Sequence, residues 1–192
     1  QLPKGVFGSG LLYFACIGTG FMMVQIPLIQ RFSVYLGHPV YAVSVLLFSM
    51  IIAAGLGSSL SDRIAVERDR RWTLALPLSI VALISAIYLL SGPIIQATID
   101  QGLLVRCVIV VLLVATAALP MGMCFPLGLR LFRQYSDDCL PWMWGVNGAT
   151  GVLASVLAVA ISMWSGINTS LLVAIGCYAL LIVPARGLSK QH

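Results

Sequence analysis

The segment Ser61–Arg71 reads Ser-Asp-Arg-Ile-Ala-Val-Glu-Arg-Asp-Arg-Arg and separates two long apolar runs. Seven of its 11 residues are charged, in a chain of 192 residues in which only 9% are. A charge cluster between two runs that are long enough to cross a bilayer is a loop held at one membrane face. Because this loop carries four arginines, and Lys and Arg near segment ends resist translocation, we expect it at the cytoplasmic face.

The composition of the whole chain indicates an integral membrane protein. It is 60% hydrophobic with a mean hydropathy of +1.02, whereas a soluble domain is about half apolar and about a quarter charged. The net charge of +5 does not favour nucleic-acid binding, because the basic residues stand at the ends of apolar runs. We interpret them as topology signals and expect the lipid bilayer as the surroundings.

The apolar pattern predicts an all-α membrane protein with a single domain, residues 1–192, and six transmembrane helices. A spanning helix needs about 20 apolar residues, and six windows meet or approach that length. They cover residues 6–29, 39–60, 72–90, 103–129, 142–164 and 169–184. The fourth window is long and contains Pro120 and Pro126, so a tilt or kink is expected there.

The distribution of basic residues fixes the expected orientation. With Ser61–Arg71 inside the cell, both termini are cytoplasmic as well, and the 11 Lys and Arg residues divide nine to two. The inner nine are Lys4, Arg63, Arg68, Arg70, Arg71, Arg130, Arg133, Arg186 and Lys190, and the outer two are Arg31 and Arg106.

Polar side chains inside spanning segments are costly and are therefore candidate functional residues. They are Gln25, Gln30, Arg31, Arg106 and Asn147. Together with His38, in a short external turn, the residues of the first and fourth windows could line an outward-facing polar pocket for a substrate. The alternative is that they form hydrogen bonds between helices or snorkel to the headgroups, with Asp100 as a counter-charge for Arg106.

The sequence contains no recognisable catalytic or metal-binding pattern. The five cysteines are scattered, without a CxxC or Cys/His spacing, and all six acidic residues lie between apolar runs. We find no phosphate-binding loop, no nucleophile elbow and no paired carboxylates within a spanning segment. We therefore expect no metal, no cofactor and no enzymatic activity.

Small residues recur at three- and four-residue steps in two windows. They are Gly145, Gly148, Gly151, Ala154, Ser155 and Ala158 in the fifth, and Ala53, Ala54, Gly55 and Gly57 in the second. In lipid, helices associate where small residues allow their backbones to approach closely. These stripes predict either packing within the bundle or an interface with a partner.

Four stretches carry a more specific resemblance. They are GTGFMMVQIPLIQRF (18–32), LGHPVYAVSV (36–45), PMGMCFPLGLR (120–130) and WMWGVNGA (142–149). Together they resemble the membrane portion that follows the catalytic domain in bacterial spermidine-synthase-like fusion proteins. The resemblance implies a location in the bacterial inner membrane and a module without its enzyme. Family members commonly have Glu where this chain has Gln25, so a titratable group is absent here.

A second resemblance is to one half of a major-facilitator transporter, which also has six helices with both ends inside. The loop residues Gly57, Asp62, Arg63, Arg70 and Arg71 are similar to the motif between the second and third helices of such proteins. Two hypotheses follow. The chain anchors or scaffolds other membrane subunits or a cytoplasmic synthase-like domain, or it is a half-transporter that dimerises to carry a small polar or cationic substrate.

Overall fold

The computed structural model describes residues 4–63, 71–135 and 138–189, and these form helices with no strand among them. The helices are α1 (Lys4–Leu36), α2 (Pro39–Ser61), α3 (Arg71–Thr98), α4 (Leu103–Arg133), α5 (Leu140–Ser165), α6 (Ile167–Leu180) and α7 (Ile182–Ser189). Within the described ranges, six helical segments are long and apolar enough to cross a membrane, the sixth being Ile167–Ala185. The expected all-α architecture with six spans is confirmed.

Two predicted helix ends were wrong. The first and third helices were expected to end near residues 29 and 90, but α1 continues to Leu36 and α3 to Thr98, with Pro27 and Pro93 inside them. A proline in a membrane helix is tolerated where neighbouring groups satisfy the freed backbone. The expected sixth span, 169–184, lies within the spanning segment Ile167–Ala185, which has a break at Leu181 near Pro184, a residue that cannot donate to the carbonyl four residues earlier.

Helix α1 ends where the sequence permits a reversal of the chain. Gly37 has a φ of 80°, a left-handed conformation that glycine adopts without strain, and its N–H donates to the carbonyl of Val34. His38 then caps α2, because its Nδ1 accepts from the N–H of Val40 at 3.2 Å. Pro39 occupies the first helical turn, where a missing N–H is harmless.

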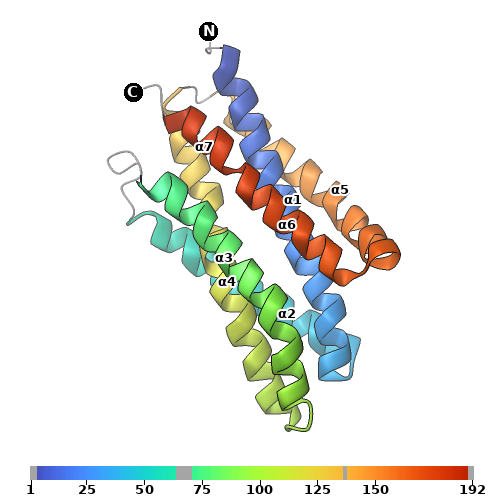
Figure 1. The fold of residues 1–192 in the computed structure, drawn as a ribbon. Coiled ribbons are helices and arrows are strands. Elements are labelled where there is room, and N and C mark those ends of the chain that lie inside the picture. The colour runs from blue at the N-terminus through green and yellow to red at the C-terminus, as the bar shows by residue number, and fades with distance from the viewer. Residues whose placement is uncertain (1–3, 64–70, 136–137, 190–192) are drawn as a thin grey trace.

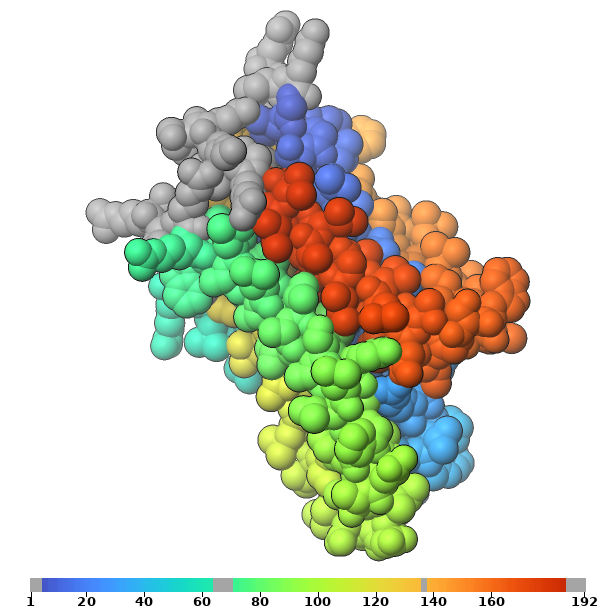
Figure 2. Space-filling model, viewed as in Figure 1, coloured from blue at the N-terminus to red at the C-terminus, as the bar shows by residue number. Residues whose placement is uncertain are grey.

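Helix α1 is the centre of the bundle and α5 lies at its edge. Buried residues make up 61% of the spanning window of α1 but only 22% of that of α5. In Figure 1, α1 runs behind α6, while α5 leans away from α3 and α4. The start of α1 and the end of α7 lie at the same end of the bundle, which we call the terminal end. Figure 2 shows α3 and α6 covering one face of the molecule.

The packing follows an inverted pattern. The two most extensive helix pairs are α2 with α4 and α1 with α5. If α1, α2 and α3 are exchanged with α4, α5 and α6 in that order, the α2–α4 pair becomes the α5–α1 pair. Because each half has an odd number of spans, its counterpart runs in the opposite direction, as in inverted-repeat membrane proteins. The two most extensive helix pairs thus have the relation that an inverted repeat of three spans would give them.

Glycines make both close pairs possible. A Cβ on Gly57 of α2 would overlap the carbonyl oxygen of Leu119 on α4, and one on Gly122 would overlap the backbone of Ala54. On the other side, a Cβ on Gly18 of α1 would overlap the carbonyl oxygen of Asn147 on α5. The predicted small-residue packing is thus found at these crossings.

Candidate functional site

A cavity of about 260 Å³ lies between α1, α4 and α5. We call it the α5 cavity. It exists because α5 packs closely on α1 but makes few contacts with α4. Gly18 and Phe21 of α1, Gly122 and Phe125 of α4, and Asn147 and Gly148 of α5 are among the residues that line it. Glycine backbone bounds part of the cavity, and apolar side chains supply most of the remaining surface.

Aromatic rings close the cavity toward the terminal end. Phe125 lies against Trp144 of α5, with ring centroids 4.5 Å apart and an edge-to-face angle of 76°. On its other side Phe125 meets Phe14 of α1 at 5.4 Å, again edge to face. Such pairs contribute about 0.5–1.5 kcal/mol beyond the burial of their area. They join the three helices where α4 and α5 otherwise make little contact.

Asn147 supplies the polar group of the cavity. Its side-chain oxygen Oδ1 is buried and has no hydrogen-bond partner within the described part of the chain. The backbone carbonyl of the same residue lies against Gly18, so the position of Asn147 is fixed by the α1–α5 crossing. A buried acceptor without a donor costs about 1–3 kcal/mol. Asn147 is the one sequence-predicted polar residue that lines this cavity.

The polar residues predicted on α1 lie nearer its far end and engage other helices. Arg31 donates to Oγ of Ser91 on α3 and to Oδ1 of Asn168 on α6. Gln25 is only 8% exposed, and Oε1 of Gln30 is buried without a partner among the described residues. Because α1 extends to Leu36, these residues lie within the helix and not at its outer end as expected. Arg31 thus links three helices.

Arg106 occupies a different place from Arg31. Its Nη1 donates to the backbone carbonyl of Tyr35 at 2.8 Å, and its guanidinium carbon lies 5.9 Å from the centre of the Tyr35 ring. Asp100 was the expected counter-charge of Arg106. The partner found is instead the backbone carbonyl of Tyr35, which is free to accept because it lies at the end of α1. Tyr35 also shares a hydrogen bond of 2.6 Å with Thr98 of α3. His38 is exposed and serves as a helix cap.

Sequence reasoning missed the partners of these arginines. Ser91, Asn168 and Thr98 are common polar residues in helices, and nothing in their spacing relates them to α1. A signal for the cavity did exist, because a glycine precedes a phenylalanine by three residues in both Gly18–Phe21 and Gly122–Phe125. The inverted packing brings these two stretches to opposite walls of one space.

The predicted loop motif divides between two environments. Gly57 is buried at the α2–α4 crossing, whereas Asp62 and Arg63 are exposed immediately after α2. Arg71 begins α3, and Arg70 lies outside the described residues. Across from them, Arg130 of α4 donates to the carbonyl of Ser61, the last residue of α2.

A second hollow lies on the outer side of α5 near the terminal end. It has a volume of about 500 Å³ and is lined by Trp142, Gly145, Val146 and Ala149 together with Pro141. A Cβ on Gly145 or Gly148 would meet nothing within 4 Å. The predicted stripe on α5 therefore has two parts. Gly151, Ala154 and Ala158 are buried in the bundle, and the part nearer the terminal end is uncovered.

The described part of the chain contains no group of three or more His, Cys, Asp or Glu side chains able to hold a metal ion. Its five cysteines are free thiols. In the segments that the structure covers, the chemistry of the site is thus an apolar cavity with one amide group.

The fold defines a class, that of a polytopic helical bundle with six segments able to span a membrane. Comparison of the chain with protein-family models, curated proteins and solved structures found no match.

Proposed function

We propose that the chain is a non-catalytic membrane module that scaffolds a larger complex, with the outer side of α5 as its docking face. The observation that supports this most is the uncovered small-residue patch formed by Gly145 and Ala149. The proposed occupant is a transmembrane helix of a partner subunit. The resembled fusion proteins suggest that this partner in turn holds a cytoplasmic synthase-like domain.

The physical argument comes from the helix crossings inside this bundle. In lipid, apolar area gives little reason for helices to associate, so close packing at small residues supplies much of the attraction. The α1–α5 and α2–α4 crossings use glycines in this way. Gly145 and Ala149 lie on one face of α5, four residues apart, beside a hollow of about 500 Å³ into which the ridge of a second helix could pack.

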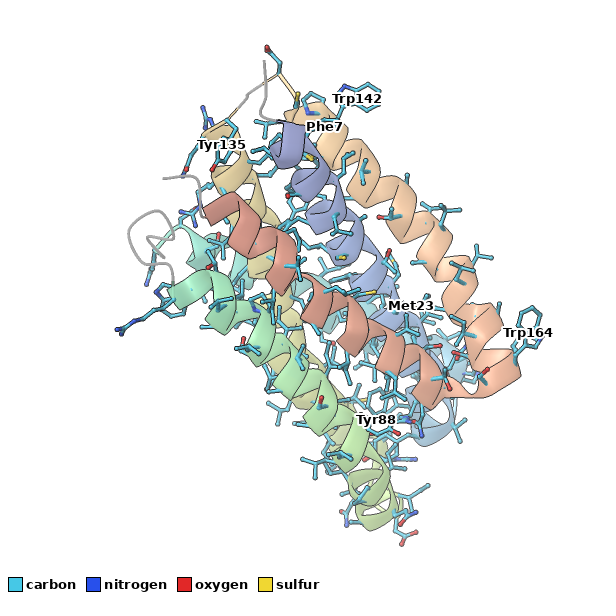
Figure 3. All side chains as sticks on the ribbon, turned by 45° about the horizontal axis from the view of Figure 1, so that its top comes forward. Phe7, Met23, Tyr88, Tyr135, Trp142 and Trp164 are labelled. Atoms are coloured by element: carbon cyan, nitrogen blue, oxygen red, sulfur yellow. The ribbon has the colours of Figure 1, made fainter. Side chains whose placement is uncertain are left out.

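The tryptophans of α5 support a position across the bilayer. Figure 3 shows Trp142 and Trp164 at opposite ends of α5, both pointing away from the bundle. They are 66% and 87% exposed, and 22 residues of helix place them about 33 Å apart, close to the thickness of the hydrocarbon core. We place the terminal end at the cytoplasmic face of a bacterial inner membrane, so the docking face lies in the inner leaflet.

Co-purification from the native membrane tests the scaffold. The tagged chain is solubilised in mild detergent, and the stoichiometry of bound subunits is measured by native mass spectrometry. Gly145→Leu should remove the partner, whereas Gly55→Leu should retain it. Both positions have nothing within 4 Å, so neither substitution disturbs the bundle itself. Equal partner content in the two variants would contradict the proposal.

Photo-crosslinking gives a second, positional test. A photoreactive residue at Ala149 should attach to the partner subunit, and one at the exposed Leu56 of α2 should not. If the product joins two copies of this chain, the complex is a homo-oligomer and the proposed foreign subunit is wrong.

The alternative is a half-transporter that dimerises, and the inverted packing of α1–α3 and α4–α6 favours it. In inverted-repeat transporters, binding sites lie near the bilayer midplane between the repeats. The α5 cavity lies beside Gly18 of α1 and Gly122 of α4, away from both helix ends. Uptake of a small polar or cationic solute into reconstituted vesicles, reduced by Asn147→Leu but not by Gly55→Leu, would favour transport over the scaffold.

A further inference from the structure

The α5 cavity has the dimensions of a small-molecule site. Its volume of about 260 Å³ exceeds the roughly 150 Å³ of an apolar protein cavity that holds benzene. The walls of Phe21, Phe125 and Met22 offer ring edges and a thioether, which pack well against aromatic molecules. Gly18, Gly122 and Gly148 are among the lining residues, so the space is bounded partly by backbone.

The polar group of the cavity selects for a hydrogen-bond donor. Oδ1 of Asn147 is buried and has no partner in the described segments. Asn147 lines the cavity and its χ2 torsion is soft, so a bound donor can draw this oxygen toward the cavity by rotating the amide group. A ligand that donates to Oδ1 would satisfy an acceptor that the fold leaves unpaired, and an apolar ligand of the same shape would not.

The charge of the surroundings selects for a neutral donor. No acidic or basic side chain is among the described residues that line the cavity. An ammonium group would therefore lose its hydration without meeting a counter-charge, which is far more costly than burying a hydroxyl that makes one hydrogen bond. Cation–π attraction from two phenylalanines compensates only a small part of that cost.

We propose that the α5 cavity binds a membrane-dissolved molecule that has a neutral, ring-sized apolar body and one hydroxyl group, and that the hydroxyl donates to Oδ1 of Asn147. This site is independent of the docking face, because the cavity opens between α5 and α4 and the hollow beside Gly145 lies on the outer side of α5. The scaffold could fail its test without affecting this proposal.

Binding of 2-naphthol, compared with naphthalene, tests the proposal. The two probes share an aromatic body, and only 2-naphthol carries a hydroxyl. Saturable binding to the intact chain in detergent is measured by fluorescence after equilibrium dialysis against matched micelles. The unmodified protein should bind 2-naphthol about tenfold more tightly than naphthalene, as expected for one buried hydrogen bond.

Three variants separate the contribution of the hydrogen bond to Asn147 from that of the cavity volume. Asn147→Leu keeps a similar volume but removes the acceptor, so it should still bind naphthalene and lose the preference for 2-naphthol. Gly148 lines the cavity and a Cβ there would meet nothing within 4 Å, so Gly148→Leu should fill part of the space and abolish saturable binding of both probes. Gly55→Leu adds the same side chain elsewhere on the lipid-facing surface and should bind as the unmodified protein does.

Two results would overturn the proposal. Saturable binding of 2-naphthol to Gly148→Leu at the unmodified level would place the probe outside this cavity. A preference for 2-naphthol that survives in Asn147→Leu would show that Oδ1 is not the acceptor. Thermal unfolding of each variant is measured in parallel, and a folded Gly148→Leu protein makes its loss of binding attributable to the filled space.

Discussion

Replacing Gly57 with alanine should weaken the bundle at its most extensive helix pair. The added methyl group would overlap the carbonyl oxygen of Leu119 on α4, at a distance that real Cβ atoms essentially never show. The obstacle is backbone, which cannot rotate aside as a side chain can. The substitution therefore forces α2 and α4 apart or distorts one of them.

The expected magnitude follows from comparing two positions on α2. Alanine is favoured over glycine in a helix by about 1 kcal/mol, and this gain applies equally at Gly57 and at Gly55. Gly55 has nothing within 4 Å, so Gly55→Ala carries no steric cost. Overpacking in a well-packed interior costs about 1–3 kcal/mol. Gly57→Ala should therefore be about 1–3 kcal/mol less stable than Gly55→Ala.

The assay is reversible unfolding in mixed micelles of rising dodecyl sulfate content, followed by helical circular dichroism. The free energy of unfolding of each alanine variant is compared with that of the unmodified protein. Values for the two variants that agree within about 0.5 kcal/mol would refute the close α2–α4 approach, since substitutions at unconstrained positions differ by no more than that.

Three further outcomes are expected. Arg130→Met removes the donor to the carbonyl of Ser61 and should lower the free energy of unfolding by about 1–2 kcal/mol, with Arg130→Lys restoring part of it. Tyr13→Phe removes the buried hydrogen bond of 2.9 Å to the carbonyl of Cys124. It should lower the free energy of unfolding by about 1 kcal/mol in the same assay, the usual net contribution of one hydrogen bond, because the carbonyl of Cys124 stays within its helix. A membrane-impermeant thiol reagent should modify Cys139 in inverted membrane vesicles and not in right-side-out ones, with Cys139→Ser as the control, and the opposite result would contradict the proposed orientation.

The sequence was sufficient to predict the spans because each is specified locally. A run of about 20 apolar residues bounded by charges has one stable solution in a bilayer. The ends were predicted less well, because α1 and α3 continue seven and eight residues beyond the apolar windows that predicted them. Pro27 and Pro93 lie within continuous helices, whereas Pro184 accompanies a break at Leu181. The residues around a proline decide this outcome, and their positions depend on tertiary structure.

The candidate site was less predictable than the fold, because it depends on which helices meet. Asn147 was identified as a polar residue at membrane depth, but its cavity requires α5 to approach α1 and diverge from α4. Gln25, Arg31 and Arg106 were expected to share one pocket. The structure instead gives Arg31 and Arg106 separate partners on different helices, because α1 is two turns longer than predicted.

Arg106 and Arg130, two of the three arginines of α4, show how this helix can hold the ends of α1 and α2. Arg106, near its start, donates to the carbonyl of Tyr35 at the end of α1, and Arg130, near its end, donates to the carbonyl of Ser61 at the end of α2. Carbonyls in a last turn lack helical donors and carry the negative end of the helix dipole, so a guanidinium suits both places. The arginines are separated by 24 residues, or about 36 Å of helix, slightly more than the hydrocarbon thickness. Each can therefore bind a helix end at its own interface, and α4 fixes the depth of α1 and α2 relative to each other while glycines set their spacing.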